Sequence, residues 1–134
     1  MKLEPINPES LGAPKGYSNG MLAAAGGRLL FVAGQIAFDE KQQVVGGDFA
    51  AQFERALSNV VTVVRAAGGA PEHVARMTIY VTDKRAYLAD LLAVGKHYRA
   101  LMGRHYPAMT LVEVEALLED RALVEIEATA VLPP

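Results

Sequence analysis

The sequence predicts an α+β domain in which helices pack on one face of a mixed β-sheet. Segments with alternating apolar and polar residues, typical of half-buried strands, occur near both ends and in the middle of the chain. The two segments between them repeat apolar residues at helical spacing. The predicted order is therefore hairpin, helix, strand, helix, hairpin. Two helices can cover only one face of a sheet of five or six strands, so the other face should be open to solvent or line a site.

The first predicted hairpin joins residues 20–25 to residues 28–36. The Gly26-Gly27 pair between them is typical of a tight turn, because glycine adopts positive φ at little cost. A polar loop over residues 39–47 then leads to the first helix.

The strongest secondary-structure prediction is a helix that begins after Asp48, a typical N-cap residue, and ends at Gly68-Gly69. Residues 74–82 follow as a strand, because their apolar and polar side chains alternate. Asp83 is the next predicted N-cap, and the helix that follows it should end near Gly103.

The last thirty residues contain two alternating segments, residues 106–115 and 124–131, joined by a short polar stretch. So short a connection predicts that the two strands pair as antiparallel neighbours. Such a pair would place up to four carboxylates on one face of the sheet, those of Glu113, Glu115, Glu125 and Glu127. That face is then either solvated or lines a site.

Length and composition predict a single domain over residues 1–134, with residues 1–15 as a loosely ordered N-terminal arm. No stretch approaches the roughly 20 apolar residues of a membrane-spanning helix. Residues 1–8 carry charges and two prolines and do not resemble a signal peptide, so the expected location is the cytoplasm, without membrane attachment. A net charge of −2 without a basic cluster gives little reason to expect nucleic acid as a partner.

The side chains that usually hold metals are scarce. The chain has no cysteine, and His73, His97 and His105 are too far apart in sequence for a local metal-binding motif. We therefore expect neither a metal nor another cofactor.

In order and spacing, these residues resemble the RidA/YjgF family, the reactive-intermediate deaminases. The resemblance extends from Gly16 to Val131, nearly the whole domain. The matching landmarks are Gly16-Tyr17-Ser18, residues 31–36, Asp48, Gln52, Leu57, Asn59, Ala67-Gly68, residues 80–83, Tyr106-Pro107-Ala108, residues 112–114 and residues 125–128.

The resemblance implies a chorismate-mutase-like fold with a mixed six-stranded sheet and two helices on one face, assembled as a homotrimer with ligand clefts between subunits. It also implies roles for individual residues. Glu125 occupies the position of the family glutamate that directs a water molecule at the imine carbon. Tyr17 occupies the position of the family's pocket tyrosine. These two residues are therefore the predicted catalytic residues. Gly34 takes the position of the glycine after the second strand, where the backbone can approach a substrate closely.

Met109 stands where members that act on small 2-imino acids have the arginine that binds the substrate carboxylate. Methionine has no hydrogen-bond donor, and losing such a partner costs about 2–5 kcal/mol, or about 30- to 5000-fold in binding. Two more pocket positions are apolar here, with Ala33 in place of a serine and Leu111 in place of a cysteine. We therefore expect Gly34, Ala33, Met109 and Leu111 to contact a ligand that is larger than a small 2-imino acid, or neutral. Another arginine could substitute, but spacing favours none of Arg76, Arg104 and Arg121.

The predicted function is hydrolytic deamination, or tautomerisation, of an imine or enamine intermediate. The alternative is a non-catalytic trimer that binds a small metabolite in the cleft between subunits. Some members of the family are described as ribonucleases or translation inhibitors, and the missing basic patch argues against that activity here.

Overall fold

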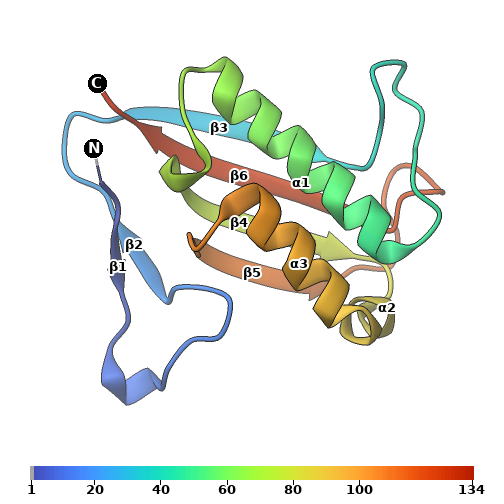
Figure 1. The fold of residues 1–134 in the computed structure, drawn as a ribbon, viewed down its shortest axis with the longest axis horizontal. Coiled ribbons are helices and arrows are strands. Elements are labelled where there is room, and N and C mark those ends of the chain that lie inside the picture. The colour runs from blue at the N-terminus through green and yellow to red at the C-terminus, as the bar shows by residue number, and fades with distance from the viewer. Residues whose placement is uncertain (1) are drawn as a thin grey trace.

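The computed structural model describes residues 2–134, which form two layers, a sheet and a set of helices on one of its faces (Figure 1). The strands are β1 (Glu4–Ile6), β2 (Gly20–Leu22), β3 (Arg28–Gln35), β4 (Val74–Val81), β5 (Ala108–Glu113) and β6 (Val124–Leu132). The helices are α1 (Phe49–Ala66), α2 (Lys84–Ala89) and α3 (Leu91–Met102), with short 3₁₀ turns at Glu9–Leu11 and Pro71–His73. The predicted α+β class is therefore confirmed.

The main sheet has four strands in the order β3-β6-β4-β5. β6 pairs antiparallel with β3 and with β4, whereas β4 and β5 are parallel. The predicted pairing of the last two strands is therefore wrong, because β4 lies between them. The ten residues 114–123 allow this arrangement, because they carry the chain from one side of β4 to the other. At the end of β4, the Val114 N–H donates a hydrogen bond to the Val81 carbonyl, and the Thr82 N–H donates one to the Leu123 carbonyl.

The predicted set of four carboxylates is also wrong, and the reason is the same crossing. Glu113 is level with the buried Val81, and its Oε1 accepts a hydrogen bond of 2.9 Å from the backbone N–H of Lys84 at the beginning of α2. Glu115 lies in the loop beyond β5. Only Glu125 and Glu127, on β6, remain on the open face.

The predicted N-terminal hairpin does not form. β2 pairs antiparallel with β1 rather than with β3, and these two short strands stand apart from the main sheet (Figure 1). Residues 23–27 separate β2 from β3, and only Gly26 in that segment has positive φ, so the link is longer than a two-residue hairpin turn. The implied six-stranded sheet is therefore a four-stranded sheet and a separate two-stranded one.

The first predicted helix is confirmed as α1. The side chain of Asp48 accepts a 2.8 Å hydrogen bond from Ala51 N–H at its N-terminus. The second predicted helix is interrupted at Asp90, which ends α2 and begins α3. Aspartate competes for backbone hydrogen bonds and favours helix ends, which accounts for the break.

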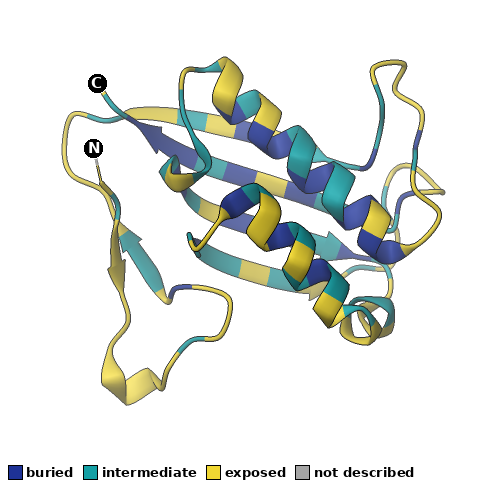
Figure 2. Ribbon diagram, viewed as in Figure 1, coloured by how far each residue is buried: buried dark blue, intermediate teal, exposed yellow. Residues whose placement is uncertain are grey.

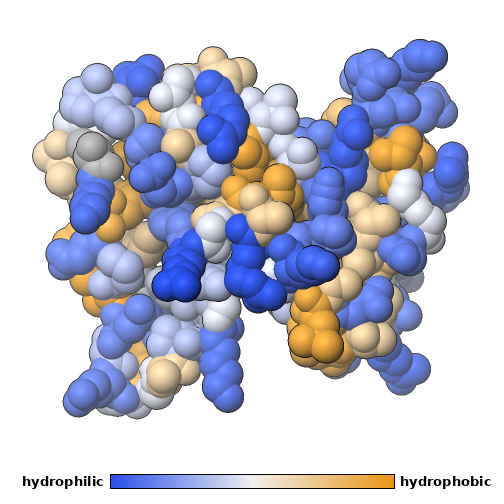
Figure 3. Space-filling view, viewed as in Figure 1, coloured by the Kyte–Doolittle hydropathy of each residue, from blue (hydrophilic) through white to orange (hydrophobic). Residues whose placement is uncertain are grey.

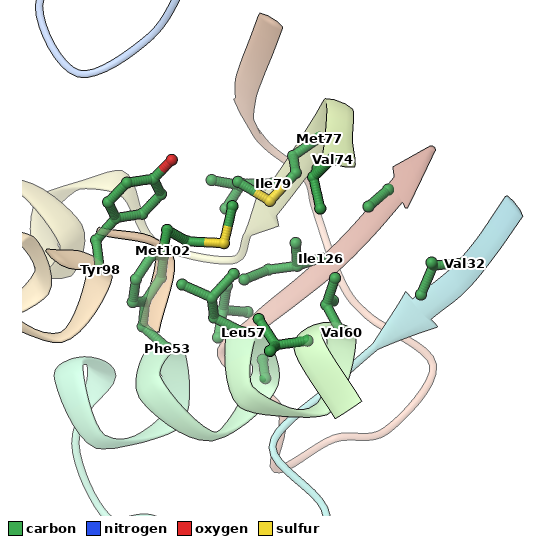
Figure 4. Close-up of a cluster of buried hydrophobic side chains, with 14 of the residues drawn as sticks. Val32, Phe53, Leu57, Val60, Val74, Met77, Ile79, Tyr98, Met102 and Ile126 are labelled. Carbon is green, nitrogen blue, oxygen red and sulfur yellow. The ribbon is translucent and has the colours of Figure 1, made fainter. Parts of the chain in front are cut away.

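The core lies between the sheet and the helices, where the buried residues of both layers meet (Figure 2). Phe53 and Leu57 of α1 point towards Met77 of β4 and Ile126 of β6, and all four are fully buried (Figure 4). α1 packs against β6, β3 and α3. No helix among residues 2–134 is long and apolar enough to cross a membrane.

One buried polar residue links α1 to the segment that precedes β6. Gln52 Nε2 donates to the carbonyls of Gly46 and Arg121 at 3.2 and 3.0 Å, and its Oε1 accepts from Leu123 N–H at 2.8 Å. All polar groups of this side chain are thereby satisfied within the protein. The start of β6, which carries Glu125, is consequently held in place.

Candidate functional site

Glu125, the predicted acid/base, lies against a β-bulge in β3. The pairing of β3 with β6 is regular up to Val32 and resumes at Gln35, so Ala33 and Gly34 form the irregular step. A methyl group added to Gly34 would lie 2.6 Å from Glu125 Oε2 and 2.8 Å from its carboxyl carbon. The carboxylate therefore fills the space that a side chain at position 34 would need. Three of the six predicted site residues come together here.

Tyr80 is a neighbour of Glu125 that sequence reasoning did not include. It is paired with Glu125 across β4 and β6, and its hydroxyl donates a 3.0 Å hydrogen bond to Glu127 Oε2. This hydrogen bond, followed by burial and the charges of Glu127 and Glu125, raises the pKa of Tyr80. The sequence contained a signal for this neighbour. Tyr80 alternates with the core residues of β4, so its side chain lies on the opposite face of the sheet, which carries Glu125 and Glu127.

The open face of the sheet is hollowed beside these residues. A cavity of about 260 Å³ is lined by Phe31, Arg76, Thr78, Glu127 and Thr129. Phe31 is 74% exposed and Leu29, also on β3, is 63% exposed. The face thus combines a polar hollow with large apolar side chains that the chain itself leaves uncovered.

Tyr17 and Met109 come together in a second group at the beginning of β5. They line a cavity of about 230 Å³ with Arg76 and Thr110. The neighbouring Ser18 fixes the approach of this segment, since its hydroxyl donates a 2.5 Å hydrogen bond to the Tyr106 carbonyl. Of the three arginines considered as substitutes, Arg76 is the one that lies beside Met109 here.

Met109 also lines a larger cavity, of about 350 Å³, on the helix side of the sheet. Its walls include Tyr87, Tyr98 and Tyr106, and Arg99 of α3 contributes a charge. Leu111 lies two residues further along β5, level with Ile79, and packs against the core next to this cavity.

The two tyrosines nearest the end of α3 form a rigid wall. The rings of Tyr98 and Tyr106 stack at a centroid distance of 5.3 Å, and the Tyr98 hydroxyl donates a 2.6 Å hydrogen bond to the His105 carbonyl. Burial, and then the proximity of Tyr106, raise the pKa of Tyr98 well above its usual value.

Within one chain, the Glu125 group and the Met109 group do not form one pocket. Glu125 is level with Tyr80 on β4, and Met109 is level with Met77. Three residues along a strand correspond to about 10 Å. Glu125 moreover shares the open face with Tyr80, whereas Met109 shares the helix-facing side with the buried Met77. The structure therefore separates Ala33, Gly34 and Glu125 from Tyr17 and Met109, and it places Leu111 against the core.

No cluster of three or more histidine, aspartate or glutamate side chains suited to a metal ion occurs among residues 2–134.

The fold, with helices on one face of a mixed sheet, and the separation of Glu125 from Met109 define a class of small α+β proteins. Residues 8–132 match the family model described as Endoribonuclease L-PSP. The chain belongs to this family, known as RidA/YjgF. It is 35% identical to the RutC family protein PH0854 of Pyrococcus horikoshii over 88% of this chain and 90% of that protein. It is 36% identical to the 2-iminobutanoate/2-iminopropanoate deaminase of Salmonella typhimurium over 78% of this chain and 80% of the deaminase. A solved structure of YyfB, a Rid family protein of Yersinia pestis, superposes with a TM-score of 0.86 at 35% identity, covering 98% of this chain and all of YyfB.

Proposed function

We propose that this protein is a RidA-like enzyme that hydrolytically deaminates, or tautomerises, an imine or enamine intermediate. The observation that carries the proposal is the Glu125 carboxylate held over the bulge at Gly34. Similarity to a 2-iminobutanoate/2-iminopropanoate deaminase supports the same reaction class.

In the proposed hydrolysis, Glu125 accepts a proton from a water molecule as the water oxygen attacks the imine carbon. The resulting carbinolamine then breaks its C–N bond. The proton that Glu125 took from the water neutralises the nitrogen of the carbinolamine before this cleavage. Glu125 then carries the hydroxyl proton of the carbinolamine to the same nitrogen as the C–N bond breaks and the C=O bond forms, so the products are a carbonyl compound and ammonia. In tautomerisation the same carboxylate moves a proton between the nitrogen and the carbon of an enamine. Tyr17 donates a hydrogen bond to the substrate, and the backbone at Gly34 lets it approach closely.

We further propose that the active assembly is a homotrimer whose clefts combine the Glu125 group of one copy with the Tyr17 and Met109 group of the next. Two observations support this arrangement: Glu125 and Met109 belong to opposite faces of the sheet within one chain, and the open face exposes Phe31 and Leu29. Large exposed apolar side chains on a sheet face are typical of an interface. The mass measured by sedimentation equilibrium tests the trimer.

The proposed substrate is not a small 2-imino acid, because Met109 offers a carboxylate no hydrogen bond. Ammonia release from freshly generated 2-iminopropionate tests this, with wild type, Met109→Arg and Glu125→Ala compared. Activity only in Met109→Arg is expected. Activity in wild type that Glu125→Ala abolishes would contradict the substrate proposal and leave the reaction class standing.

The second candidate function is that of a non-catalytic metabolite-binding trimer, which the apolar replacements at Ala33, Met109 and Leu111 favour. Glu125→Ala separates the two candidates. An enzyme loses turnover and keeps its ligand, whereas a binding protein has no turnover to lose.

A further inference from the structure

The cavity on the helix side of Met109 carries positive charge and no negative charge. Among residues 2–134, Lys15 and Arg99 are the charged residues that line it, and no aspartate or glutamate of this range does. The remaining lining is aromatic or aliphatic, apart from two glycines. Figure 3 shows strongly hydrophilic side chains over α3, with hydrophobic ones gathered where α2 meets α3. The cavity thus pairs an apolar interior with a cationic boundary, which suits an anion that has an apolar body.

The Arg99 side chain can lie in the cavity because Gly95, one turn earlier on α3, has no side chain there. A methyl group added to Gly95 would lie 3.1 Å from Arg99 Nη1, so the guanidinium lies across the space that a side chain at position 95 would use. Residues four apart on a helix share one face. Glycine within a helix is unfavourable by about 0.5–1 kcal/mol relative to alanine, so its presence here calls for a reason.

The guanidinium of Arg99 has its donors available. Arg99 is exposed, and within residues 2–134 no hydrogen bond or ion pair joins its side chain to another residue. Arginine presents parallel donors that match the two oxygens of a carboxylate. A carboxylate entering this cavity would therefore meet an arginine that need not break another interaction.

We propose that Arg99 binds the carboxylate of the substrate in this cavity, in place of an arginine at position 109, and that the substrate is an imino acid with an aromatic or branched side chain. This inference rests on the proposed deaminase function and names its substrate class. Met109 then forms an apolar wall beside the substrate, and Tyr98 and Tyr106 provide aromatic surface. Lys15 adds positive charge at the boundary.

The size of the cavity agrees with that class. One water molecule takes up about 30 Å³ in the liquid, so 350 Å³ corresponds to roughly a dozen non-hydrogen atoms. An aromatic 2-oxo acid has about that size. A three-carbon acid would leave about half of the apolar wall without contact.

Calorimetric titration with phenylpyruvate, a stable oxo-acid counterpart of an aromatic imino acid, tests the role of Arg99. Pyruvate and the uncharged phenylacetone are the comparison ligands. The test variant is Arg99→Gln. The matched control is Arg104→Gln, which removes an equal charge from an exposed position that lines none of these cavities.

We expect wild type to bind phenylpyruvate at least tenfold more tightly than pyruvate. Arg99→Gln should weaken phenylpyruvate binding by about 10- to 150-fold, which is the loss in affinity expected when a hydrogen bond to a charged group is removed. The same substitution should change phenylacetone binding by less than about twofold. Arg104→Gln should leave both unchanged. Equal phenylpyruvate affinity in wild type and Arg99→Gln, or equal losses in the two variants, would overturn the assignment of Arg99.

This outcome can be separated from a failure of the proposed reaction. Ammonia release from the imine of phenylpyruvate is measured in parallel for wild type and Glu125→Ala. If phenylpyruvate binding depends on Arg99 but ammonia release does not depend on Glu125, the binding site stands and the catalytic proposal fails. If ammonia release depends on Glu125 but neither binding nor turnover depends on Arg99, the catalytic proposal stands and the anchor is refuted.

Discussion

Replacing Gly34 by alanine should impair catalysis while leaving the fold intact. The added methyl group would lie 2.6 Å from Glu125 Oε2, and ordinary contacts begin near 3.4 Å, so the carboxylate must move by roughly 0.8 Å. A misplacement of about 1 Å in a catalytic group costs about 100-fold in rate. Gly34 is not among the residues with positive φ, and Glu125 is partly exposed and free to swing outwards. We therefore expect the free energy of unfolding to change by less than about 0.5 kcal/mol.

The assay is ammonia release from the imine of phenylpyruvate, generated in situ by an L-amino acid oxidase. Its expected result is a loss of about 100-fold in kcat/KM for Gly34→Ala, close to that of Glu125→Ala. Gly20→Ala is the matched control, because its methyl group would meet only Ile6, at an ordinary 3.6 Å. Undiminished activity in Gly34→Ala would refute the placement of Glu125 in the reaction, and an equal loss in Gly20→Ala would show that the effect is not local.

Two further substitutions probe the helix side. Gly95→Ala should stabilise the protein by about 0.5–1 kcal/mol, as measured by urea unfolding. It should also weaken phenylpyruvate binding, because the end of the Arg99 side chain must shift by a few tenths of an ångström. A stability gain with unchanged affinity would contradict the role of this glycine. Tyr98→Phe leaves the His105 carbonyl without its hydrogen bond and should cost about 1–3 kcal/mol near neutral pH. Because the folded state raises the Tyr98 pKa, the unfolded chain loses that proton first above the ordinary value of 10.0, so the stability contributed by Tyr98 falls as the pH rises. The cost of Tyr98→Phe in urea unfolding should therefore shrink above about pH 10, and a constant difference up to pH 11 would argue against it.

The elements of this fold can be predicted from the sequence more readily than their partners. Alternation along residues 74–82 identified β4 and its buried face, and Asp48 marked the beginning of α1. Alternation does not say which strand lies alongside, and a ten-residue connection between β5 and β6 was compatible with either a hairpin or a crossing over β4. The hairpin expected at Gly26-Gly27 failed for the same reason, since β1 provided another partner for β2.

The candidate site divides in the same way. Family resemblance supplied Glu125, Gly34 and Met109, and the structure shows that the carboxylate of Glu125 fills the space where a side chain at position 34 would lie. Arg99 was not predicted, although the pair Gly95 and Arg99 was visible at helical spacing. A glycine inside a helix, one turn before an arginine, becomes informative only when the cavity beside it is known.

The division of the site between two faces leads to a test that joins catalysis and binding. If each cleft takes Glu125 from one copy and Arg99 from the next, Glu125→Ala and Arg99→Gln damage different subunits of the same cleft. Trimers reassembled from an equal mixture of the two variants should then contain intact clefts in about a quarter of positions, because a head-to-tail interface joins two different surfaces. Activity should therefore recover to about a quarter of the wild-type value, although each variant alone is nearly inactive. A mixture no more active than its components would refute the shared cleft.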